Sequence, residues 1–504
     1  MKKIIEIYKV LKDEDLLVSQ IQEGFENIEV EDITYDSREV CQGTLFFCKG
    51  KAFKRDYLIN SIADGACAYV SEEDYHVEIP AIIVKDIRKA MISVAAFFFD
   101  YPDEKIKIIG VTGTKGKTTT VKYLKAIFDE YLTKNGKKPC GLVSSVNVYD
   151  GVSDNSATLT TPEAIPLYKH INNAVNSGLE YLVLEVSSQA LKYHRVTKIK
   201  FDLSCFLNIG DDHVSAIEHP TFEDYFNSKL SLAKQSDYFI YNSQMDNVEQ
   251  VQARVKELNI GYMTFSLDNQ RDDIYALNID HKVQGTTFQA NYHGKAREFT
   301  LKMPGDYNVE NALCAILVAY KMGLDYQSIR DGLSEVVVEG RDIILESDDK
   351  KIIAWINYAH NGISFQKSYE TIKGSYGDYR IISVYGGSGD KAHTRLVDVS
   401  SIGAKYSDYI VIVPDDPGSK PYDQIISEMR VYIEAENVPF EYFEDRAEGI
   451  QRAFDLVEGE KTLIFIAGKG SDAYNVINGQ YVDIEDDVTS TNRIMAAYNK
   501  KNKY

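Results

Sequence analysis

The sequence lacks the features of a protein held together by disulfides or structural zinc. Its six cysteines are scattered, no two form a C-x-x-C pair, and no histidines cluster at metal-ligand spacing. Because disulfide and zinc frameworks depend on such spacing, we expect reduced thiols in the protein core. The cysteines are Cys41, Cys48, Cys67, Cys140, Cys205 and Cys314.

The sequence also lacks a long apolar run. The longest, 92–99, is far shorter than the roughly 20 residues that a membrane-spanning helix needs. Charged residues interrupt the segment 1–17 every few positions, so it lacks the apolar stretch of a signal peptide. These absences predict a cytoplasmic protein with no membrane partner.

Positive charge is in deficit. The formal net charge of −20 opposes attraction to nucleic acid or to an anionic membrane surface, although it permits a local basic pocket for a phosphorylated small molecule. We therefore expect small-molecule substrates and no nucleic-acid partner.

What the sequence does contain is core material for several domains. The chain has 504 residues, of which 44% are hydrophobic and 26% charged, as in soluble globular proteins. This length exceeds one ordinary hydrophobic core. We find no internal repeat or low-complexity segment, and we take a monomer as the default.

Strand-like and helix-like stretches alternate and predict an α/β protein with three domains. Residues 1–103 form a small first unit that ends at the turn signal Tyr101-Pro102-Asp103. The unit 104–340 is expected to hold a mostly parallel sheet, and the alternation begins afresh in 341–504. Strands are expected at 43–48, 79–84, 105–111, 181–184, 238–241, 352–356, 379–385, 409–413 and 462–467.

A loop rich in glycine and lysine follows the first strand of the central unit. It reads G-V-T-G-T-K-G-K-T-T over 110–119 and precedes a helix that is expected from Lys117. Its backbone N–H groups and the helix N-terminus suit phosphate oxygens, while Lys117 would neutralise the phosphates and Thr118 would bind Mg²⁺. Val111 departs from the general pattern, which has glycine there. The context predicts an ATP site at Thr112, Gly113, Thr114, Lys115, Gly116, Lys117, Thr118 and Thr119.

Other polar residues follow strands of the same unit. Glu185 ends the run 181–184, at the edge where open α/β sheets bind ligands, and is a candidate Mg²⁺ ligand. His213 follows a strand expected over 203–209, and its combination with Glu185 favours a metal role for both. Taken alone, each residue is more often a cap or a structural hydrogen-bonding group. Lys229 lies in a helical stretch, where the pattern by itself indicates a solvated lysine.

These segments together resemble the Mur ligase family, the cytoplasmic enzymes that build the peptide of peptidoglycan precursors. Within the family, D-S-R at 36–38 and T-T-P-E at 160–163 look like the branch that adds the third residue to UDP-MurNAc-L-Ala-D-Glu. The matching segments are T-G-T-K-G-K-T-T at 112–119, T-T-P-E at 160–163, E-V-S-S-Q-A-L at 185–191, H-R-V at 194–196, D-H at 212–213, D-Y-F-N-S-K at 224–229, N-V-E-N at 308–311, G-R at 340–341, Y-A-H-N at 358–361 and A-G-K-G at 467–470.

The resemblance implies a UDP-binding N-terminal domain, a central P-loop ATPase and a Rossmann-like C-terminal domain that brings in the amino acid. It implies an ATP- and Mg²⁺-dependent ligase of peptidoglycan synthesis, and so a role in cell shape and cell division. Lys229 would be carbamylated and would hold metal with Thr118, Glu185 and His213. The other implied residues are Lys117 and Arg341 in catalysis, Asn308 and Asn311 at the nucleotide, and Ser37, Thr160, Thr161, Ser187 and Arg195 at the UDP-muramoyl dipeptide.

The chemistry suits such a site, because a carboxylate is a poor electrophile until one of its oxygens becomes a leaving group. Transfer of the γ-phosphoryl group of ATP to the D-Glu γ-carboxylate gathers negative charge, which Mg²⁺ and Lys117 would offset. The amine of the incoming amino acid then attacks the acyl phosphate. Closure of the C-terminal domain would exclude water from it.

The D-D-P-G turn at 415–418 bears on which amino acid enters. In this branch an arginine at the fourth position accompanies meso-diaminopimelate, because it can pair with the distal carboxylate, whereas this chain has Gly418. With carboxylates available for an ammonium group we expect L-lysine, although D-D-P-G also suits a simple turn. The expected amino-acid site comprises Lys391, Asp415, Asp416, Pro417, Gly418, Gly468 and Asp472.

Several departures from the family pattern leave alternatives open, among them Lys391, which stands where diaminopimelate enzymes have arginine. Asn357 stands where the D-Y-A-H motif of the family has aspartate, and Gly418 is unusual in lysine-type sequences. The alternatives are the same ligase with meso-diaminopimelate or L-ornithine, a non-catalytic or partner-dependent paralogue, and a folylpolyglutamate synthase-like ligase. The D-S-R and T-T-P-E segments argue against the last.

Overall fold

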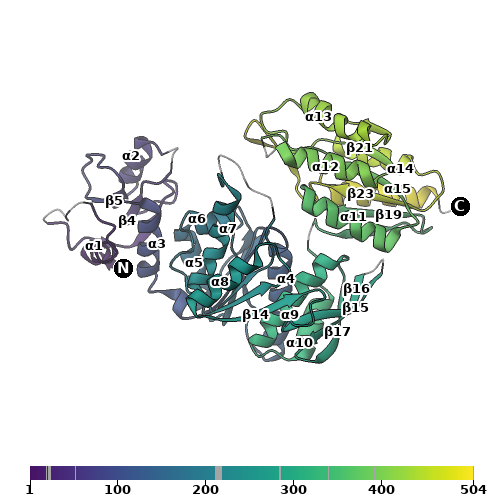
Figure 1. The fold of residues 1–504 in the computed structure, drawn as a ribbon. Helices are drawn as coiled ribbons and strands as arrows, with labels where there is room; N and C mark the ends of the chain where they lie inside the picture. Colours follow the sequence, from purple (N-terminus) through teal and green to yellow (C-terminus); the bar gives the residue numbers. More distant parts are fainter. Residues whose placement is uncertain are drawn as a thin grey trace.

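The computed structural model describes residues 1–18, 20, 24–50, 53–210, 218–282, 285–338, 340–390 and 393–502. Three larger sheets follow one another along the described part of the chain, each flanked by helices (Figure 1), and two two-stranded sheets, β1 with β2 and β24 with β25, lie in the first and last units. The N-terminal and C-terminal units lie at opposite ends of the molecule, with the central unit between them. The predicted fold class, α/β with three domains, is confirmed, while the boundaries at 103/104 and 340/341 remain predictions.

The N-terminal unit is built on a parallel four-stranded sheet with the order β3-β4-β5-β6. Helix α3 starts where Asp86 accepts hydrogen bonds from the backbone N–H groups of Arg88 and Lys89. Its apolar residues are buried because α3 also packs against α5 (Ala164–Asn176) of the central unit, so one core runs across both units. The elements are β1 (Lys2–Lys3), α1 (Ile4–Asp13), β2 (Glu29–Val30), β3 (Asp32–Thr34), β4 (Thr44–Phe47), α2 (Arg55–Ala63), β5 (Ala66–Ser71), β6 (Ala81–Ile83) and α3 (Ile87–Phe98).

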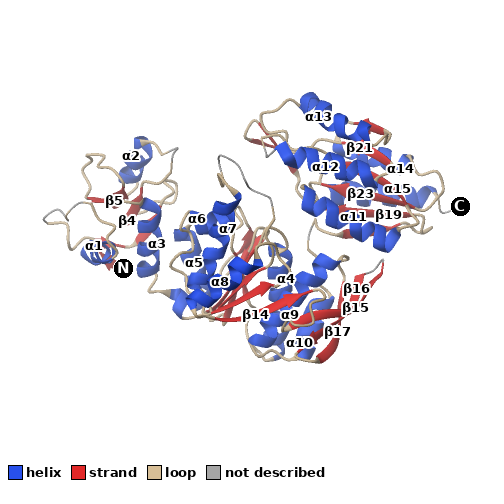
Figure 2. Ribbon diagram, in the orientation of Figure 1, coloured by secondary structure: helices blue, strands red, loops and turns tan. Residues whose placement is uncertain are grey.

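The central sheet has eleven strands in the order β10-β9-β8-β11-β7-β12-β13-β14-β15-β16-β17, with a parallel middle and antiparallel edges. Successive residues of β7 face opposite sides, Ile108 toward one core and Ile109 toward another, so apolar helices cover both faces (Figure 2). The strands are β7 (Lys107–Thr112), β8 (Gly141–Val143), β9 (Asn147–Tyr149), β10 (Asp154–Ser156), β11 (Tyr181–Glu185), β12 (Leu203–Phe206), β13 (Tyr238–Asn242), β14 (Gly261–Ser266), β15 (Ile274–Lys282), β16 (Gly285–Tyr292) and β17 (Lys295–Leu301). The helices are η1 (Pro102–Glu104), α4 (Lys117–Lys134), α5 (Ala164–Asn176), α6 (Ser188–Lys192), α7 (Phe222–Leu230), η2 (Ser231–Gln235), α8 (Val248–Leu258), α9 (Asp306–Lys321) and α10 (Tyr326–Ser334).

The C-terminal sheet has the order β18-β19-β23-β20-β21-β22 and is parallel except at β18. Trp355 and Ile356 of β19 again face different cores. The elements are β18 (Ile343–Glu346), β19 (Ile352–Asn357), α11 (Gly362–Tyr376), β20 (Arg380–Tyr385), α12 (His393–Tyr406), β21 (Tyr409–Ile412), α13 (Tyr422–Ala435), β22 (Phe440–Tyr442), α14 (Arg446–Asp455), β23 (Thr462–Ala467), β24 (Tyr474–Ile477), β25 (Gln480–Asp483) and α15 (Asp487–Lys501).

Each expected strand overlaps an observed one, and the ends differ by a few residues at most. The largest difference is at 203–209, where β12 stops at Phe206. Within the described part of the chain, no helix has both the length and the apolar character needed to cross a bilayer.

Candidate functional site

A cavity of about 530 Å³ opens where the central sheet meets the C-terminal unit. Residues of both units line it, and most of the predicted site residues are among them. Those residues are Thr114, Lys115, Gly116, Lys117, Thr118, Thr119, Thr160, Thr161, Glu185, Ser187, Arg195, Lys229, Asn311, Arg341 and Asp472.

The phosphate loop joins β7 to α4 as the sequence predicted. Gly116 has φ +83°, and a Cβ there would lie 2.2 Å from Oδ1 of Asn311, so the loop requires glycine at this point. The Nζ of Lys117 donates to the carbonyl oxygens of Gly113 at 3.0 Å and Thr114 at 3.3 Å. The lysine therefore folds over the loop at the N-terminus of α4, where anions are favoured.

Oxygen atoms converge beside the loop. The Oγ1 of Thr118 lies 3.2 Å from both carboxylate oxygens of Glu185 and 3.0 Å from Oγ of Ser145. Thr118 and Glu185 are each 2% exposed. This is a donor set of hard oxygens, which suits Mg²⁺. No group of three or more His, Cys, Asp or Glu side chains that could hold a metal was found among the described residues, and His213 lies outside them.

Lys229 is buried, against the expectation of a solvated side chain that its helical pattern alone gave. It is 1% exposed, its Nζ donates to the carbonyl of Gly113 at 2.8 Å, and it sits 4.7 Å from the ring centre of Tyr225. The Tyr225 hydroxyl in turn lies 3.0 Å from Oγ1 of Thr114. Helix α7 therefore brings this amine to the phosphate loop.

A second polar group lies where β11 enters α6. Thr161 donates to the carbonyl of Glu185 at 2.8 Å and accepts from the N–H of Ser187 at 3.0 Å. Arg195 donates to the carbonyl of Thr161 at 3.1 Å and pairs with Glu163 at 2.8 Å. Among the described residues, the Nε of Arg195 is a buried atom without a hydrogen-bond partner, which leaves one donor for a ligand.

Glu163 also connects the first two units. Its carboxylate lies 2.7 Å from Nζ of Lys49, and both side chains are 12% exposed. Burial lowers the pKa of Lys49, and the contact with Glu163 opposes that shift. Lys49 could not be predicted from the sequence, because an isolated lysine in a loop carries no local signal. Ser37 lies on this unit, away from the cavity lining.

The junction to the C-terminal unit contains a buried carboxylate that the sequence analysis also missed. Asp342 is 7% exposed and accepts hydrogen bonds from four side chains. The donors are Tyr307 at 2.5 Å, Asn308 at 3.0 Å, Trp355 at 3.2 Å and Asn357 at 2.5 Å. Burial raises the pKa of Asp342, and hydrogen bonds from Tyr307 and Asn308 oppose the rise. Its position directly after Gly340-Arg341 was the only available signal.

The turn 415–418 lies outside the main cavity lining. Gly418 has φ +61°, and a Cβ there would lie 2.2 Å from a carboxylate oxygen of Asp390, which explains glycine at this position. Asp416 accepts from Nζ of Lys469 at 2.9 Å and from the N–H of Val476 at 2.9 Å. These contacts hold the turn against the loop that follows β23.

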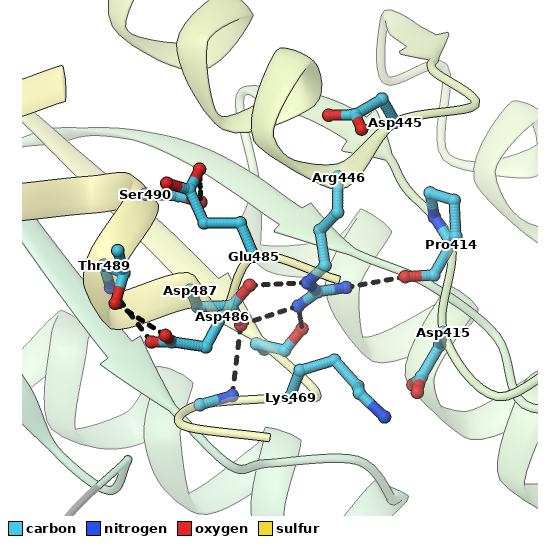
Figure 3. Close-up of polar contacts among 12 residues, drawn as sticks. Pro414, Asp415, Asp445, Arg446, Lys469, Glu485, Asp486, Asp487, Thr489 and Ser490 are labelled. Carbon is cyan, nitrogen blue, oxygen red and sulfur yellow. Dashed lines mark hydrogen bonds and ion pairs between the residues drawn. The ribbon is translucent and has the colours of Figure 1, made fainter. Parts of the chain in front are cut away.

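Behind the turn, Arg446 forms a buried ion pair with Asp487 (Figure 3). The guanidinium also donates to the carbonyls of Pro414 at 2.9 Å and Ala467 at 2.7 Å. Asp415 is buried next to this pair, and burial raises its pKa, which Arg446 and Lys469 oppose. Asp415 lines a separate cavity of about 620 Å³ on this side of the turn.

Most residues predicted to bind the nucleotide and the muramoyl dipeptide line the main cavity together with Arg341. Most residues predicted to bind the amino acid do not. Asp472 reaches the main cavity and accepts from the Tyr358 hydroxyl at 3.0 Å. Lys391 and His213 lie outside the described residues. The predicted residues away from the main cavity lining are Ser37, Thr112, Gly113, Asn308, Asp415, Asp416, Pro417, Gly418 and Gly468.

Comparison with known proteins places this geometry in a family. The Mur ligase middle domain matches residues 111–319, and the Mur ligase glutamate ligase domain matches residues 340–470. A protein of Streptococcus pneumoniae serotype 2 (strain D39 / NCTC 7466), named UDP-N-acetylmuramoyl-L-alanyl-D-glutamate--L-lysine ligase, is 35% identical over 95% of this chain and 97% of its own length. The chain belongs to the Mur ligase family.

Solved structures of Mur ligases share the whole fold. A UDP-N-acetylmuramoyl-L-alanyl-D-glutamate--2,6-diaminopimelate ligase aligns with a TM-score of 0.68 and 21% identity over 99% of each chain. The MurF ligase of Thermotoga maritima in complex with ADP aligns with a TM-score of 0.64 and 16% identity, over 94% of this chain and 98% of that one. At these identities the likeness concerns the fold alone, and it spans all three units.

Proposed function

We propose that this Mur ligase adds L-lysine to the D-Glu γ-carboxylate of UDP-MurNAc-L-Ala-D-Glu, with ATP converted to ADP and phosphate. The observation that carries the proposal is that the phosphate loop, Arg195 and Asp472 line the same cavity. A ligase must bring a phosphoryl donor, a carboxylate and an amine to one place. The relative named as an L-lysine ligase supports the choice of substrates.

In the first step the γ-phosphoryl group moves to the substrate carboxylate and gives an acyl phosphate. Lys117 and the N–H groups at the start of α4 would hold the phosphates and offset their charge. Thr118 and Glu185 would hold Mg²⁺, which neutralises phosphate charge when it is bound. Asn311 packs against Gly116 and would line the nucleotide site from α9.

The muramoyl dipeptide would lie between the loop and Arg195. The free Nε donor of Arg195 suits a substrate carboxylate, and Thr160, Thr161 and Ser187 supply neutral polar groups beside it. Ser37 would contact the uridine portion from the N-terminal unit. The pair of Lys49 with Glu163 would then fix this unit against the dipeptide site.

Lys229 would be carbamylated, which replaces an ammonium by a carboxylate-like group suited to Mg²⁺. Its burial and its place at the phosphate loop fit this modification. His213 would join the same metal site, and Arg341 would act at the hinge, 5.3 Å from the ring centre of Tyr358. Mass spectrometry of intact protein kept with bicarbonate would detect the added carbamate.

The second step is attack of the lysine amine on the acyl phosphate, with loss of phosphate. Asp472, with Asp415 and Asp416 behind it, would attract the ammonium of the side chain, and Lys391 would meet the α-carboxylate. Pro417, Gly418 and Gly468 would shape the turn around the amino acid. The reaction belongs to peptidoglycan synthesis, and we assign it to a cytoplasmic monomer that supports cell division.

The test is phosphate release by the purified protein with Mg-ATP and UDP-MurNAc-L-Ala-D-Glu. L-Lysine, meso-diaminopimelate, L-ornithine and no amino acid are compared, and products are weighed by mass spectrometry. Release chiefly with L-lysine, with a product heavier by one lysine residue, supports the proposal. Release chiefly with another amino acid would identify that amino acid as the third residue of the peptide. No release, despite binding of nucleotide and muropeptide, would indicate a non-catalytic paralogue.

A further inference from the structure

Asp342 stands at the point where the central and C-terminal units meet. Two of its donors, Tyr307 and Asn308, belong to α9, and the other two, Trp355 and Asn357, belong to β19. All four are neutral, so each can donate to an ionised carboxylate without adding charge. One buried side chain therefore ties the two units together.

The network continues from Asp342 to both sides of the main cavity. On α9, Asn311 lies three residues after Asn308, one turn along the helix, and packs against Gly116 of the phosphate loop. On β19, Asn357 accepts from the N–H of Gly468 at 3.2 Å through its backbone carbonyl. The next residue, Tyr358, donates to Asp472 in the cavity.

The backbone also fixes this junction. Gly340 has φ +69°, and a Cβ there would lie 2.4 Å from the backbone nitrogen of Ser471. Asp342 has φ +52°, an uncommon conformation for a residue with a side chain. Such a conformation persists where surrounding contacts hold it, and here the four donors do so.

Asn357 fits this environment because it can donate. Its Nδ2 lies 2.5 Å from Oδ1 of Asp342. An aspartate at 357 would set two carboxylates against each other, and two buried carboxylates at this distance cannot both ionise. Asparagine at 357 and aspartate at 342 are thus a matched pair.

We propose that Asp342 is a positioning residue that couples the nucleotide side of the cavity to the C-terminal unit, and that Asn357 is its obligate amide partner. The inference rests on the proposed ligase function and deepens it. It reverses the simplest expectation for Asn357, since an aspartate placed there is now predicted to lower activity. It also explains how a ligase can function with asparagine at this position.

The test uses three full-length variants: D342N, N357D and the exchange D342N/N357D. Each single variant should lower the rate of lysine-dependent phosphate release about tenfold or more, because buried donors or carboxylates lose their partners. In N357D the loss of rate should become larger as the pH rises. The proton shared by the two close carboxyl groups is then released, and both become charged. The exchange restores one carboxylate and one amide and should recover a large part of the rate.

Trp355 provides a second readout that does not depend on catalysis. It is the only tryptophan of the chain, it is fully buried, and it donates to Asp342. Mg-ADP should change its fluorescence in the wild type, and the change should be lost in N357D and return in the exchange variant. Thermal unfolding of each variant shows whether it folds. D325N, at the cap of α10, and N437D, in an exposed turn, are matched controls for each kind of substitution.

The outcomes separate the two proposals. If the wild type responds to Mg-ADP but forms no lysine product, the proposed function fails, and the fluorescence of Trp355 still tests Asp342. An N357D variant as active as the wild type, with an unchanged nucleotide response, overturns the inference. So does an exchange variant that is no better than N357D, even where D342N alone fails to fold.

Discussion

The parallel strands of the central sheet and of the C-terminal sheet each end at an edge that carries charged residues, and the charges are arranged differently at the two edges. At the central sheet, Lys117 and Lys229 contact backbone carbonyls of the phosphate loop. At the C-terminal sheet, Arg446 is enclosed and bonded to Asp487 and two carbonyls. At the first edge the two ammonium groups line the main cavity, while at the second edge Arg446 also borders a cavity but is already paired with a buried carboxylate.

The difference follows from what surrounds each cation. A lysine ammonium that lines a cavity next to the N-terminus of a helix can meet a phosphate bound there. Arg446 and Asp487 are 3% and 0% exposed, so their charges largely cancel within the protein. We therefore expect substitutions at the first edge to affect activity and substitutions at the second to affect stability.

The largest expected effect on activity is at Lys117. K117A should lower phosphate release about 10²- to 10³-fold, because a preorganised charge on the transferred phosphoryl group is lost. Thermal unfolding should change little, since Nζ of Lys117 donates to carbonyl oxygens of its own loop and lines the cavity. K134A, at the exposed end of the same helix, is the control and should retain activity. A K117A variant that unfolds early instead would mean that the two edges do not differ in this way.

The phosphate-loop edge could be predicted from the sequence because its residues are neighbours in the chain. Thr114 to Thr119 are consecutive residues of the loop and of the first turn of α4, and the strand before the loop and the helix after it follow from local apolar patterns. Glu185 was found because it ends an apolar strand. The fold class followed from the same alternation of strands and helices.

The rest of the site depends on pairs that are distant in the chain. Arg446 and Asp487 are 41 residues apart, and neither stands in a recognisable pattern. Asp342 gains its role only when α9 and β19 meet around it. Lys229 appeared to be a solvated residue, because a helical pattern does not reveal that α7 packs on the phosphate loop. Burial and pairing of this kind are set by tertiary structure.

The largest expected effect on stability is at Arg446. R446M should lower the free energy of unfolding by about 3–5 kcal/mol, because it leaves Asp487 buried without its cation. Urea unfolding measures the change, and R446M/D487L should recover part of it because both charges are gone. R493M, at an exposed ion pair of α15, is the control and should change little. Equal stability of R446M and the wild type would contradict a scaffolding role.

Asp472 offers a smaller effect that depends on pH. D472N should raise the KM for lysine about tenfold and leave the KM for ATP nearly unchanged, because an ammonium partner is lost. Burial raises the pKa of Asp472, so in the wild type the KM for lysine should increase as the pH falls through that raised value. In D472N this dependence should flatten.

Ionised Asp472 favours lysine binding but lowers the stability of the fold, because its carboxylate is buried. A carboxyl group whose native pKa lies above its ordinary value of 3.8 lowers stability as the pH rises from 3.8 through the raised pKa. Over that range the unfolded state has already released the proton that the native state still holds. D472N should therefore be no less stable than the wild type at neutral pH, as urea unfolding can check. A loss of stability there would attribute the change in KM to damage of the fold.

Lys49 tests a third situation, an ion pair between units that is neither open nor fully enclosed. K49M should raise the KM for UDP-MurNAc-L-Ala-D-Glu roughly three- to tenfold. Without Lys49, Glu163 keeps only Arg195 as its cation and should hold Arg195 away from the substrate. Initial rates at fixed ATP and lysine measure this change, and K54M, an exposed neighbour at the start of α2, is the control. If K49M lowered kcat instead and left the KM unchanged, the N-terminal unit would affect the chemical step. The Lys49–Glu163 pair would then not act through substrate binding.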